Sequence, residues 1–349
     1  MKPDILPHAH GGRPATASDL LRKRFLKVLI ALIMLTAILF LTGLSAGSTW
    51  LNPLEVMRHL AGAGSGEHAF VIDTLRMPRM LLAMLAGAAL GAAGLIMQGV
   101  VRNPLGSPDV VGVTGGASVA AVFFITYLAG SVSLRWLPAA AIAGAAVASA
   151  LVYALAWKKG VTPVRLVLVG IGIAACMGAL TTMMIVMGDN YSTSSAYLWM
   201  TGSVYGATKS DVLSLLPWVA LLIPLSVLFS RASGILELGD ETATGLGVRV
   251  QLHRLVMLAI SVSLAGAAVA FAGGIGFVGL IAPHMARKLV GRSFAYLVPV
   301  SALLGSLIVA LADVVARTAF LPMDIPAGVL VSGIGAPFFI YLLYRNRHQ

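Results

Sequence analysis

The chain contains a succession of apolar runs, each about as long as a helix that crosses a bilayer, and this pattern restricts the folds that it can adopt. An α-helix rises about 1.5 Å per residue, so about 20 apolar residues span the hydrocarbon core of a membrane. Charged residues, prolines or polar clusters separate ten such runs. The predicted spans are Leu26–Ala46, Met80–Val100, Val110–Ala129, Trp136–Trp157, Leu166–Met187, Val212–Ser230, Leu255–Ala272, Gly276–Leu289, Leu297–Phe320 and Ala327–Tyr344.

The composition excludes an ordinary soluble domain. Hydrophobic residues make up 58% of the 349 residues and charged residues only 11%, whereas soluble domains are about one quarter charged. We therefore predict an all-α polytopic membrane protein with one membrane domain, residues 26–349. Residues 1–25 are polar and predict a cytoplasmic tail. The run that follows lacks a small-residue cleavage pattern, so we expect a retained span and not a removed signal peptide.

The distribution of basic residues predicts the orientation. An even number of spans places both termini on the same side of the membrane, and cytoplasmic loops are enriched in Lys and Arg. With both termini in the cytoplasm, 18 of the 24 basic residues fall in inner segments. The basic residues left outside are Arg58, Arg76, Arg79, Arg135, Lys209 and Arg317. Because the charge of +11 is spread over short loops without aromatic interleaving, nucleic-acid binding is not expected.

Small residues recur inside the predicted spans at helical spacing. Gly87 and Gly91 lie four residues apart, and Gly170 and Gly172 lie in another span. Lipid provides no hydrophobic driving force between helices, so small residues that let two backbones approach are packing sites. We interpret these glycines as structural.

The chain offers no obvious source of energy for transport. The acidic residues fall in predicted loops, except Asp313, which lies towards the outer end of its span, four residues before Arg317. No ionisable relay is therefore placed at mid-membrane depth. The phosphate-binding loop that marks many nucleotide hydrolases is also missing. We expect no enzymatic activity, no cofactor and no metal site, and we expect the driving force to come from another protein.

Two arginines precede the second span on its predicted outer side. Arg76 and Arg79 lie three residues apart on one helix face, with Pro78 in the first turn and Asp73 or Thr74 as the expected cap. Guanidinium groups bind carboxylates through two hydrogen bonds, and a helix N-terminus favours anions. A site for acidic groups of a partner, anchoring to lipid phosphates and a local pair with Asp73 all remain open.

Two inner segments are too polar to span the membrane. Arg102–Asp109 contains two prolines and a glycine, which predict a turn, and Asp109 is a candidate cap for the following helix. Leu236–Gly247 combines leucines and acids with three glycines, which predict one or two short helices. This segment fits either insertion into a groove of a soluble partner or an interfacial helix on the membrane.

A fourth segment, Gly273–Lys288, begins with glycines and contains Pro283 and His284, which predict a short, bent span. His284 has no neighbours at metal-ligand spacing. We therefore expect it to hydrogen-bond neighbouring helices or backbone. Cys176 is the only cysteine, which leaves no partner for a disulfide within the chain.

These segments together resemble the permease subunits of binding-protein-dependent ABC importers for ferric siderophores, ferric citrate, haem and cobalamin. The resemblance runs from about Leu75 to the C-terminus. Its elements are Arg76–Arg79, Gly87–Gly91 with Gln98, Arg102–Asp109, Trp199–Ser203, Leu238–Val248, Gly276–His284, Ala312–Arg317 and Gly335–Ile340. The segment Pro322–Pro326 departs from the family, where a Glu or Gln more often precedes Leu-Pro.

The resemblance implies ten spans in the inner membrane, a second permease subunit, two ATP-binding subunits and a periplasmic or lipid-anchored substrate-binding protein. It implies an iron chelate as cargo, with cobalamin or haem as the alternative. An ion-coupled secondary transporter, a channel and a membrane scaffold are the rival classes.

The resemblance also implies roles for particular residues. Arg76, Arg79 and Arg317 would dock the binding protein. The loop that couples to the ATPase comprises Leu236, Glu237, Leu238, Gly239, Asp240, Glu241, Ala243, Gly245, Leu246 and Gly247. The inner mouth of the pathway comprises Asn103, Pro104, Leu105, Pro283 and His284.

Overall fold

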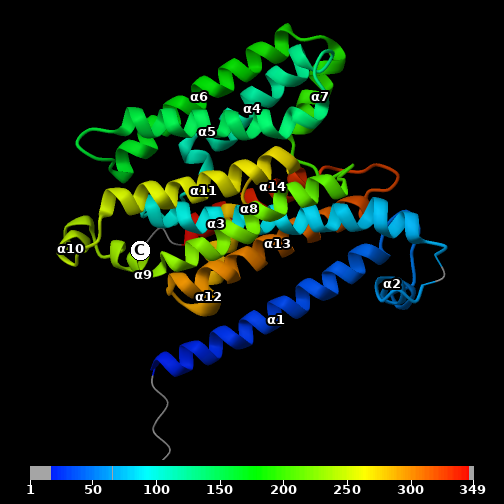
Figure 1. Ribbon diagram of the computed structural model, residues 1–349, viewed down its shortest axis with the longest axis horizontal. Helices are drawn as coiled ribbons and strands as arrows, with labels where there is room; N and C mark the ends of the chain where they lie inside the picture. Colours follow the sequence, from blue (N-terminus) through cyan, green and yellow to red (C-terminus); the bar gives the residue numbers. More distant parts are fainter. Residues whose placement is uncertain (1–16, 65, 346–349) are drawn as a thin grey trace, which may run out of the picture.

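The computed structural model describes residues 17–64 and 66–345, and this part of the chain is helical without strands (Figure 1). The first 16 residues of the predicted tail lie outside the described residues. Seven helices are long and apolar enough to cross a membrane. They are α1 (Ala17–Ser45), α3 (Met77–Val101), α5 (Leu137–Ala156), α6 (Pro163–Met187), α8 (Lys209–Leu228), α11 (Val250–Ala272) and α13 (Phe294–Ala319).

The remaining helices are shorter. Two are apolar, α4 (Val113–Phe123) and α14 (Ala327–Arg345). The others are α2 (Pro53–Leu60), α7 (Asn190–Met200), α9 (Ser230–Leu236), α10 (Asp240–Gly245) and α12 (Val278–Val290). With 13 residues, α12 is roughly 20 Å long, which is shorter than the hydrocarbon core. Each of the ten predicted spans overlaps mainly with one of these α-helices, although several boundaries differ, and Val110–Ala129 includes both α4 and its π-helical extension, Phe124–Leu128.

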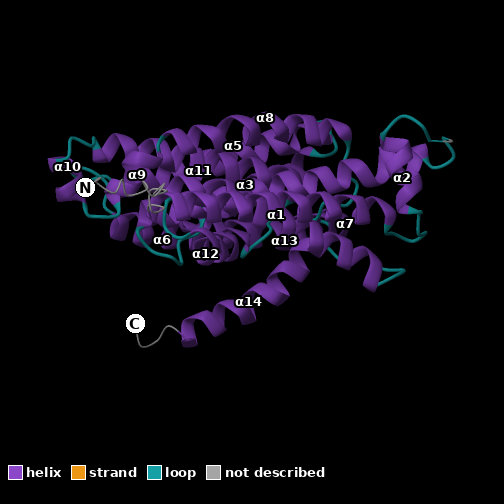
Figure 2. Cartoon of the chain, turned by 90° about the horizontal axis from the view of Figure 1, so that it is seen from below, coloured by secondary structure: helices purple, strands orange, loops and turns teal. Residues whose placement is uncertain are grey.

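The helices run roughly side by side and form two groups. In Figure 1, α3 lies among α8, α11, α12 and α13, whereas α4, α5, α6 and α7 form a separate layer beside α11. Helix α1 packs on the other side, against α13. Helices α2 and α7 lie at one end of the bundle, and α9 and α10 lie at the opposite end (Figures 1 and 2). We call these the α2 end and the α10 end.

The first turn of α1 and the last turn of α14 both lie toward the α10 end (Figures 1 and 2). This arrangement agrees with an even number of crossings. Figure 2 also shows α14 diverging from the other helices, and its Ile334 and Ile340 are 71% and 66% exposed. Apolar side chains at these positions face lipid or another protein.

The centre of the bundle depends on small residues, as predicted for Gly87 and Gly91. A Cβ added at Gly87 would lie 2.2 Å from the carbonyl oxygen of Gly305 in α13, and one at Gly91 would lie 2.3 Å from that of Ser301. The backbones of α3 and α13 therefore touch directly. Gly170 likewise lies against the carbonyl oxygen of Val110, whereas Gly172 has open space around it and makes no such contact.

Two predicted helix caps are wrong. Helical backbone extends through the π-helical segment Val71–Arg76 (η1) directly into α3, so Asp73 and Thr74 lie inside a helix and cap nothing. The Asp73 carboxylate instead lies 3.1 Å from Nε2 of His59. Gly112, with φ of +77°, precedes α4 in place of a side-chain cap, and Asp109 accepts hydrogen bonds from the hydroxyls of Ser107 and Thr114.

Candidate functional site

A cavity of about 670 Å³ lies at the α2 end of the bundle. It is bordered by the segment after α1, the start of α3, the loop before α8 and the loop between α13 and α14. Arg76, Arg79 and Arg317, the three predicted docking arginines, all line it. The fold thus brings together three side chains that the sequence separates by up to 241 positions.

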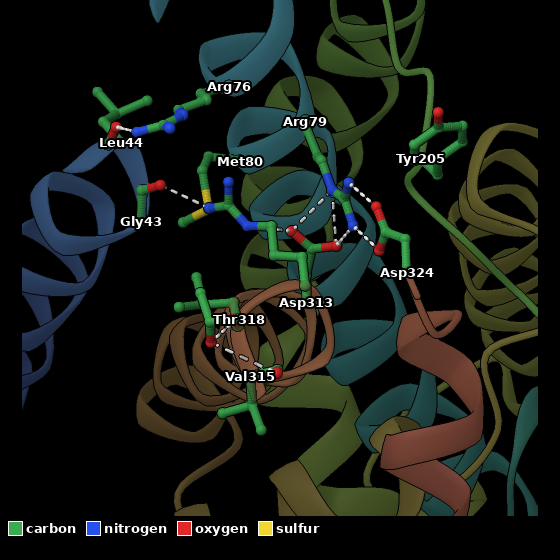
Figure 3. Close-up of polar contacts among 12 residues, drawn as sticks. Gly43, Leu44, Arg76, Arg79, Met80, Tyr205, Asp313, Val315, Thr318 and Asp324 are labelled. Carbon is green, nitrogen blue, oxygen red and sulfur yellow. Dashed lines mark hydrogen bonds and ion pairs between the residues drawn. The ribbon is translucent and has the colours of Figure 1, made fainter. Parts of the chain in front are cut away.

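Arg79 holds two carboxylates at once (Figure 3). Its Nε donates to both oxygens of Asp313, at 2.9 and 3.1 Å, while Nη1 and Nη2 donate to Asp324 at 2.7 and 2.8 Å. The side chain of Asp313 is 1% exposed, whereas that of Asp324 is 30% exposed. Arg79 also lies over the ring of Tyr205, with Cζ 5.5 Å from the ring centroid. Asp324 is therefore the partner of Arg79 that solvent can reach.

Arg76 binds the C-terminal end of α1. Its Nη1 donates to the carbonyl oxygens of Leu44 and Ser45, both at 2.8 Å, and Nη2 donates to that of Thr49 at 2.7 Å. The last carbonyls of a helix have no partner within the helix and carry partial negative charge. A guanidinium group supplies both the hydrogen-bond donors and the positive charge that these carbonyls require. Arg76 accordingly fastens α1 to α3.

Arg317 completes the cluster from α13. Its Nη2 donates to the carbonyl oxygen of Gly43 at 2.5 Å, and its Nε lies 3.5 Å from Asp313. The predicted proximity of Asp313 and Arg317 is confirmed. Arg79 and Arg317 thus lie against the carboxylates of Asp313 and Asp324, whereas Arg76 lies against backbone carbonyls, so the cluster of three arginines and two carboxylates has one positive charge in excess. Such an excess favours anionic groups at this end.

The arginines do not form the shared face predicted from their spacing. Arg76 points toward α1, whereas Arg79 points toward Asp313 and Asp324 (Figure 3). The π-helical turn before Met77 changes the spacing of side chains around the helix axis. All three arginines are at most 8% exposed, because they are already paired inside the chain.

The predicted coupling loop contains one short helix, α10, which is within the expected one or two, and α9 ends at its first residue, Leu236. Leu236 and Ala243 are buried and pack with Val250 at the start of α11. Leu238 and Leu246 are 66% and 61% exposed, and Glu237, Glu241, Gly245 and Gly247 are also exposed. Gly239 and Asp240 are partly buried. One side of the loop therefore packs against the start of α11, and the other side exposes apolar and acidic side chains.

The inner-mouth residues do not all come together. Asn103 and Pro104 line a cavity of about 340 Å³ at the α10 end, which Glu237 also lines. Leu105 is 40% exposed nearby, and its amide donates to Oδ1 of Asn103 at 2.9 Å. Pro283 and His284 lie within α12 and do not line this cavity.

His284 also differs from the prediction that it would hydrogen-bond its neighbours. Its buried Nε2 has no hydrogen-bond partner in the described part of the chain. Its ring stands edge-on to Phe338 of α14, with 6.4 Å between ring centroids. Among residues 17–64 and 66–345, no group of three or more His, Cys, Asp or Glu side chains is placed to hold a metal ion.

Several polar contacts were not anticipated. Arg287 donates to Oε1 of Gln98 at 2.5 Å, and Nε2 of Gln98 donates to the carbonyl oxygen of Gly279, so this pair joins α3 to α12. Asp240 lies between Arg102 and Arg254. These pairs join residues that are mostly more than 100 positions apart. Charges alone did not indicate which of the inner arginines pair.

Comparison with known proteins identifies the architecture. The chain matches the FecCD transport family over residues 35–345. It is 47% identical over 322 residues to the achromobactin transport system permease protein CbrC of Dickeya dadantii, covering 92% of each chain. It is 42% identical over 281 residues to the Fe(3+) dicitrate transport system permease protein FecD of Escherichia coli, covering 80% of this chain and 87% of the relative.

A solved structure agrees with this comparison. An inward-facing metal-chelate type ABC transporter matches with a TM-score of 0.80 and 29% identity, over 92% of this chain and 99% of that one. A bundle with seven long apolar helices, an arginine-lined cavity at one end and a short helical loop at the other defines a multi-pass permease of the ABC importer class. This protein belongs to the FecCD transport family, as its motifs predicted, and lies in the bacterial inner membrane.

Proposed function

We propose that this chain is the membrane-spanning subunit of an ATP-driven importer that moves a ferric siderophore or a similar iron chelate into the cytoplasm. The observation that carries the proposal is the 44% identity, over 92% of this chain and 95% of the relative, to a permease of Bacillus subtilis named for a siderophore transport system. This relative and FecD of Escherichia coli are named for siderophore and Fe(3+) dicitrate transport, which favours an iron chelate as cargo over cobalamin or haem. A secondary transporter is disfavoured by membership of this family.

We propose ten membrane crossings, with the α10 end and both termini in the cytoplasm. The seven long helices, α4 with its π-helical extension, and α14 supply nine crossings. The tenth combines α12 with the Gly-rich segment before it, because α12 alone is too short to cross the bilayer. The excess of basic residues in the predicted inner loops supports this orientation.

The partners of the proposed complex are a second permease subunit, identical or paralogous, two ATP-binding subunits and a substrate-binding protein. The exposed apolar side chains of α14 suit contact with the second permease. The exposed Leu238 and Leu246 beside Glu237 and Glu241 suit a groove of an ATP-binding subunit, because a short helix can dock by laying its apolar side chains into a hydrophobic groove. ATP hydrolysis would occur on that separate subunit.

The arginine-lined cavity is proposed as the docking site of the binding protein. Arg79 is bound on one side by the buried Asp313 and on the other by the more accessible Asp324. A carboxylate of the binding protein would replace Asp324 at Nη1 and Nη2 and leave the pair with Asp313 intact. In this proposal Arg79 contacts the partner directly, while Arg76 and Arg317 fix α1 and α13 beneath it.

The inner mouth is proposed to be the cavity lined by Asn103 and Pro104, with Leu105 at its edge. Pro283 and His284 would act from within α12, where bending of the helix changes the packing against α14. Closure of the ATP-binding subunits would move the coupling loop and tilt the bundle, so that the two ends open in turn.

Purification from native membranes tests the proposal. An affinity-tagged chain should bring down ATP-binding subunits, identified by mass spectrometry, and a variant lacking residues 237–247 should lose them while keeping the second permease. Recovery of the wild-type chain without any ATP-binding protein, or equal recovery of that protein by the deletion variant, would refute the proposal.

A further inference from the structure

Asp240 sits where three separate parts of the chain meet. Both of its carboxylate oxygens accept hydrogen bonds from Nη2 of Arg254 in α11, at 3.0 and 3.1 Å. Its Oδ1 also accepts a hydrogen bond from Nη2 of Arg102, the residue that follows α3. One carboxylate thereby joins α10 to α3 and to α11, two helices that pack against each other in the centre of the bundle.

The contacts continue from Arg254 to a further loop. Nη1 of Arg254 donates to the carbonyl oxygen of Val161, between α5 and α6, and Oε1 of Gln251 accepts from the amide of the same residue at 2.9 Å. The side chain of Arg254 is only 3% exposed. A buried guanidinium needs its charge and its donors satisfied, so this position is defined by both partners.

Helix α10 has few other attachments. Glycines with positive φ flank it, Gly239 at +115° and Gly247 at +83°, and only Ala243 of this helix is buried. Glycine joints transmit force poorly because they rotate at little cost. Within the described residues, two kinds of contact attach α10 to the bundle. One is the small apolar contact of Ala243 with Leu236 and Val250, and the polar one consists of the two ion pairs of Asp240.

The side chain of Asp240 faces the permease, and those of its neighbours do not. Glu241 is exposed and makes no ion pair within the described chain, and Leu238 and Leu246 are the exposed leucines on either side of α10. A partner docked on this loop would meet these residues first. The carboxylate of Asp240, in contrast, is already paired with Arg102 and Arg254 of the permease.

We infer that Asp240 is a positioning residue for coupling, which transmits movement of the docked loop to α3 and α11 through Arg102 and Arg254 and does not itself bind the ATP-binding subunit. The inference rests on the proposed function and changes the role of one residue in the predicted coupling loop. It divides that loop into a part that binds, Leu238, Glu241 and Leu246, and a part that transmits, Asp240.

The test compares Asp240→Asn with Glu241→Gln in the complete complex of permease and ATP-binding subunits, reconstituted into lipid vesicles. Three quantities are measured: the amount of ATP-binding subunit that co-purifies, the rate of ATP hydrolysis, and the uptake of ferric chelate per ATP hydrolysed. Asp240→Asn should keep co-purification within about two-fold and lower uptake per ATP by about ten-fold or more, a loss within the usual range of coupling between sites. Glu241→Gln should do the reverse, with weaker binding and normal uptake per ATP in the complexes that form.

Arg102→Gln is a milder variant that distinguishes loss of coupling from misfolding. It removes one of the two ion pairs and leaves Arg254 paired with Asp240. Arg102→Gln should lower uptake per ATP by a smaller factor than Asp240→Asn. The double variant should lower uptake per ATP no further than Asp240→Asn alone. Loss of the ATP-binding subunit from Asp240→Asn, or wild-type uptake per ATP in both variants, would overturn the inference. Failure of the wild-type chain to bind any ATP-binding subunit would instead refute the proposed function.

Discussion

Arg79 and Asp324 lie face to face across the α2 end, with two parallel hydrogen bonds of 2.7 and 2.8 Å between the guanidinium and the carboxylate. This is the geometry in which arginine binds a carboxylate of another protein. In this chain the carboxylate bound to Arg79 is that of Asp324, on the loop between α13 and α14. Docking through Arg79 therefore requires an exchange of carboxylates.

Asp324→Asn should strengthen docking of the binding protein. An amide competes less well than a carboxylate for Arg79, and a partly exposed pair is worth about 1 kcal/mol or less, so the dissociation constant should fall by up to about five-fold. Surface plasmon resonance on the complex in lipid nanodiscs measures this dissociation constant. Asp73→Asn is the control, since Asp73 lies at the same end but pairs with His59. Unchanged or weaker binding by Asp324→Asn contradicts the exchange.

Arg79→Gln should destabilise the permease itself. The change leaves Asp313, whose side chain is 1% exposed, with only the longer pair to Arg317. Breaking a buried pair by removing one partner costs about 3 to 5 kcal/mol. The double variant Arg79→Gln with Asp313→Asn should recover a large part of the loss in thermal unfolding of the detergent-solubilised protein. A double variant less stable than Arg79→Gln would argue against this pairing.

Gly87→Leu should separate α3 from α13. A Cβ at Gly87 would lie 2.2 Å from a backbone oxygen that cannot move aside, so we expect a loss of about 3 kcal/mol or more, or failure to assemble. The matched control is Gly172→Ala, where nothing lies within 4 Å. This control should be neutral or slightly stabilising, because alanine favours helix over glycine. Equal unfolding temperatures for both variants would contradict the close contact.

Leu246→Asp should weaken binding of the ATP-binding subunit. Leu246 is 61% exposed, so burial within the chain does not account for an apolar side chain there. Loss of an apolar anchor at an interface costs about 1 to 2 kcal/mol, so binding should weaken about ten-fold. Leu105→Asp, on another loop at the same end and 40% exposed, should retain binding. If both variants bind normally, the proposed docking surface is incorrect.

Much of the fold followed from the sequence because lipid imposes simple rules. The long apolar runs mark helices, the glycines of α3 mark close packing, and the glycines within residues 236–247 mark the ends of a short helix, α10. The pair of Asp313 and Arg317 was predictable because four residues make one helical turn. Each of these inferences uses only neighbours along the chain.

The contacts that give the sites their chemistry were not predictable in the same way. Arg79 and Asp324 are 245 positions apart, and Asp240 and Arg102 are 138 apart. Their pairing depends on how the helices pack, which no local pattern encodes. The expected caps at Asp73 and Asp109 were wrong for a related reason, since η1 continues into α3 without an end to cap and Gly112 adopts the left-handed conformation before α4.

In the proposed function, this permease moves its cargo with energy from a separate ATP-binding subunit. The most direct measurement is uptake of radiolabelled iron chelate into vesicles that contain the complete complex, with the loaded binding protein outside and ATP inside. We expect uptake that requires ATP, stops when the ATP-binding subunit is replaced by a variant unable to hydrolyse ATP, and continues when ionophores collapse the ion gradients. Uptake that persists without hydrolysis and disappears with the gradients would contradict the account.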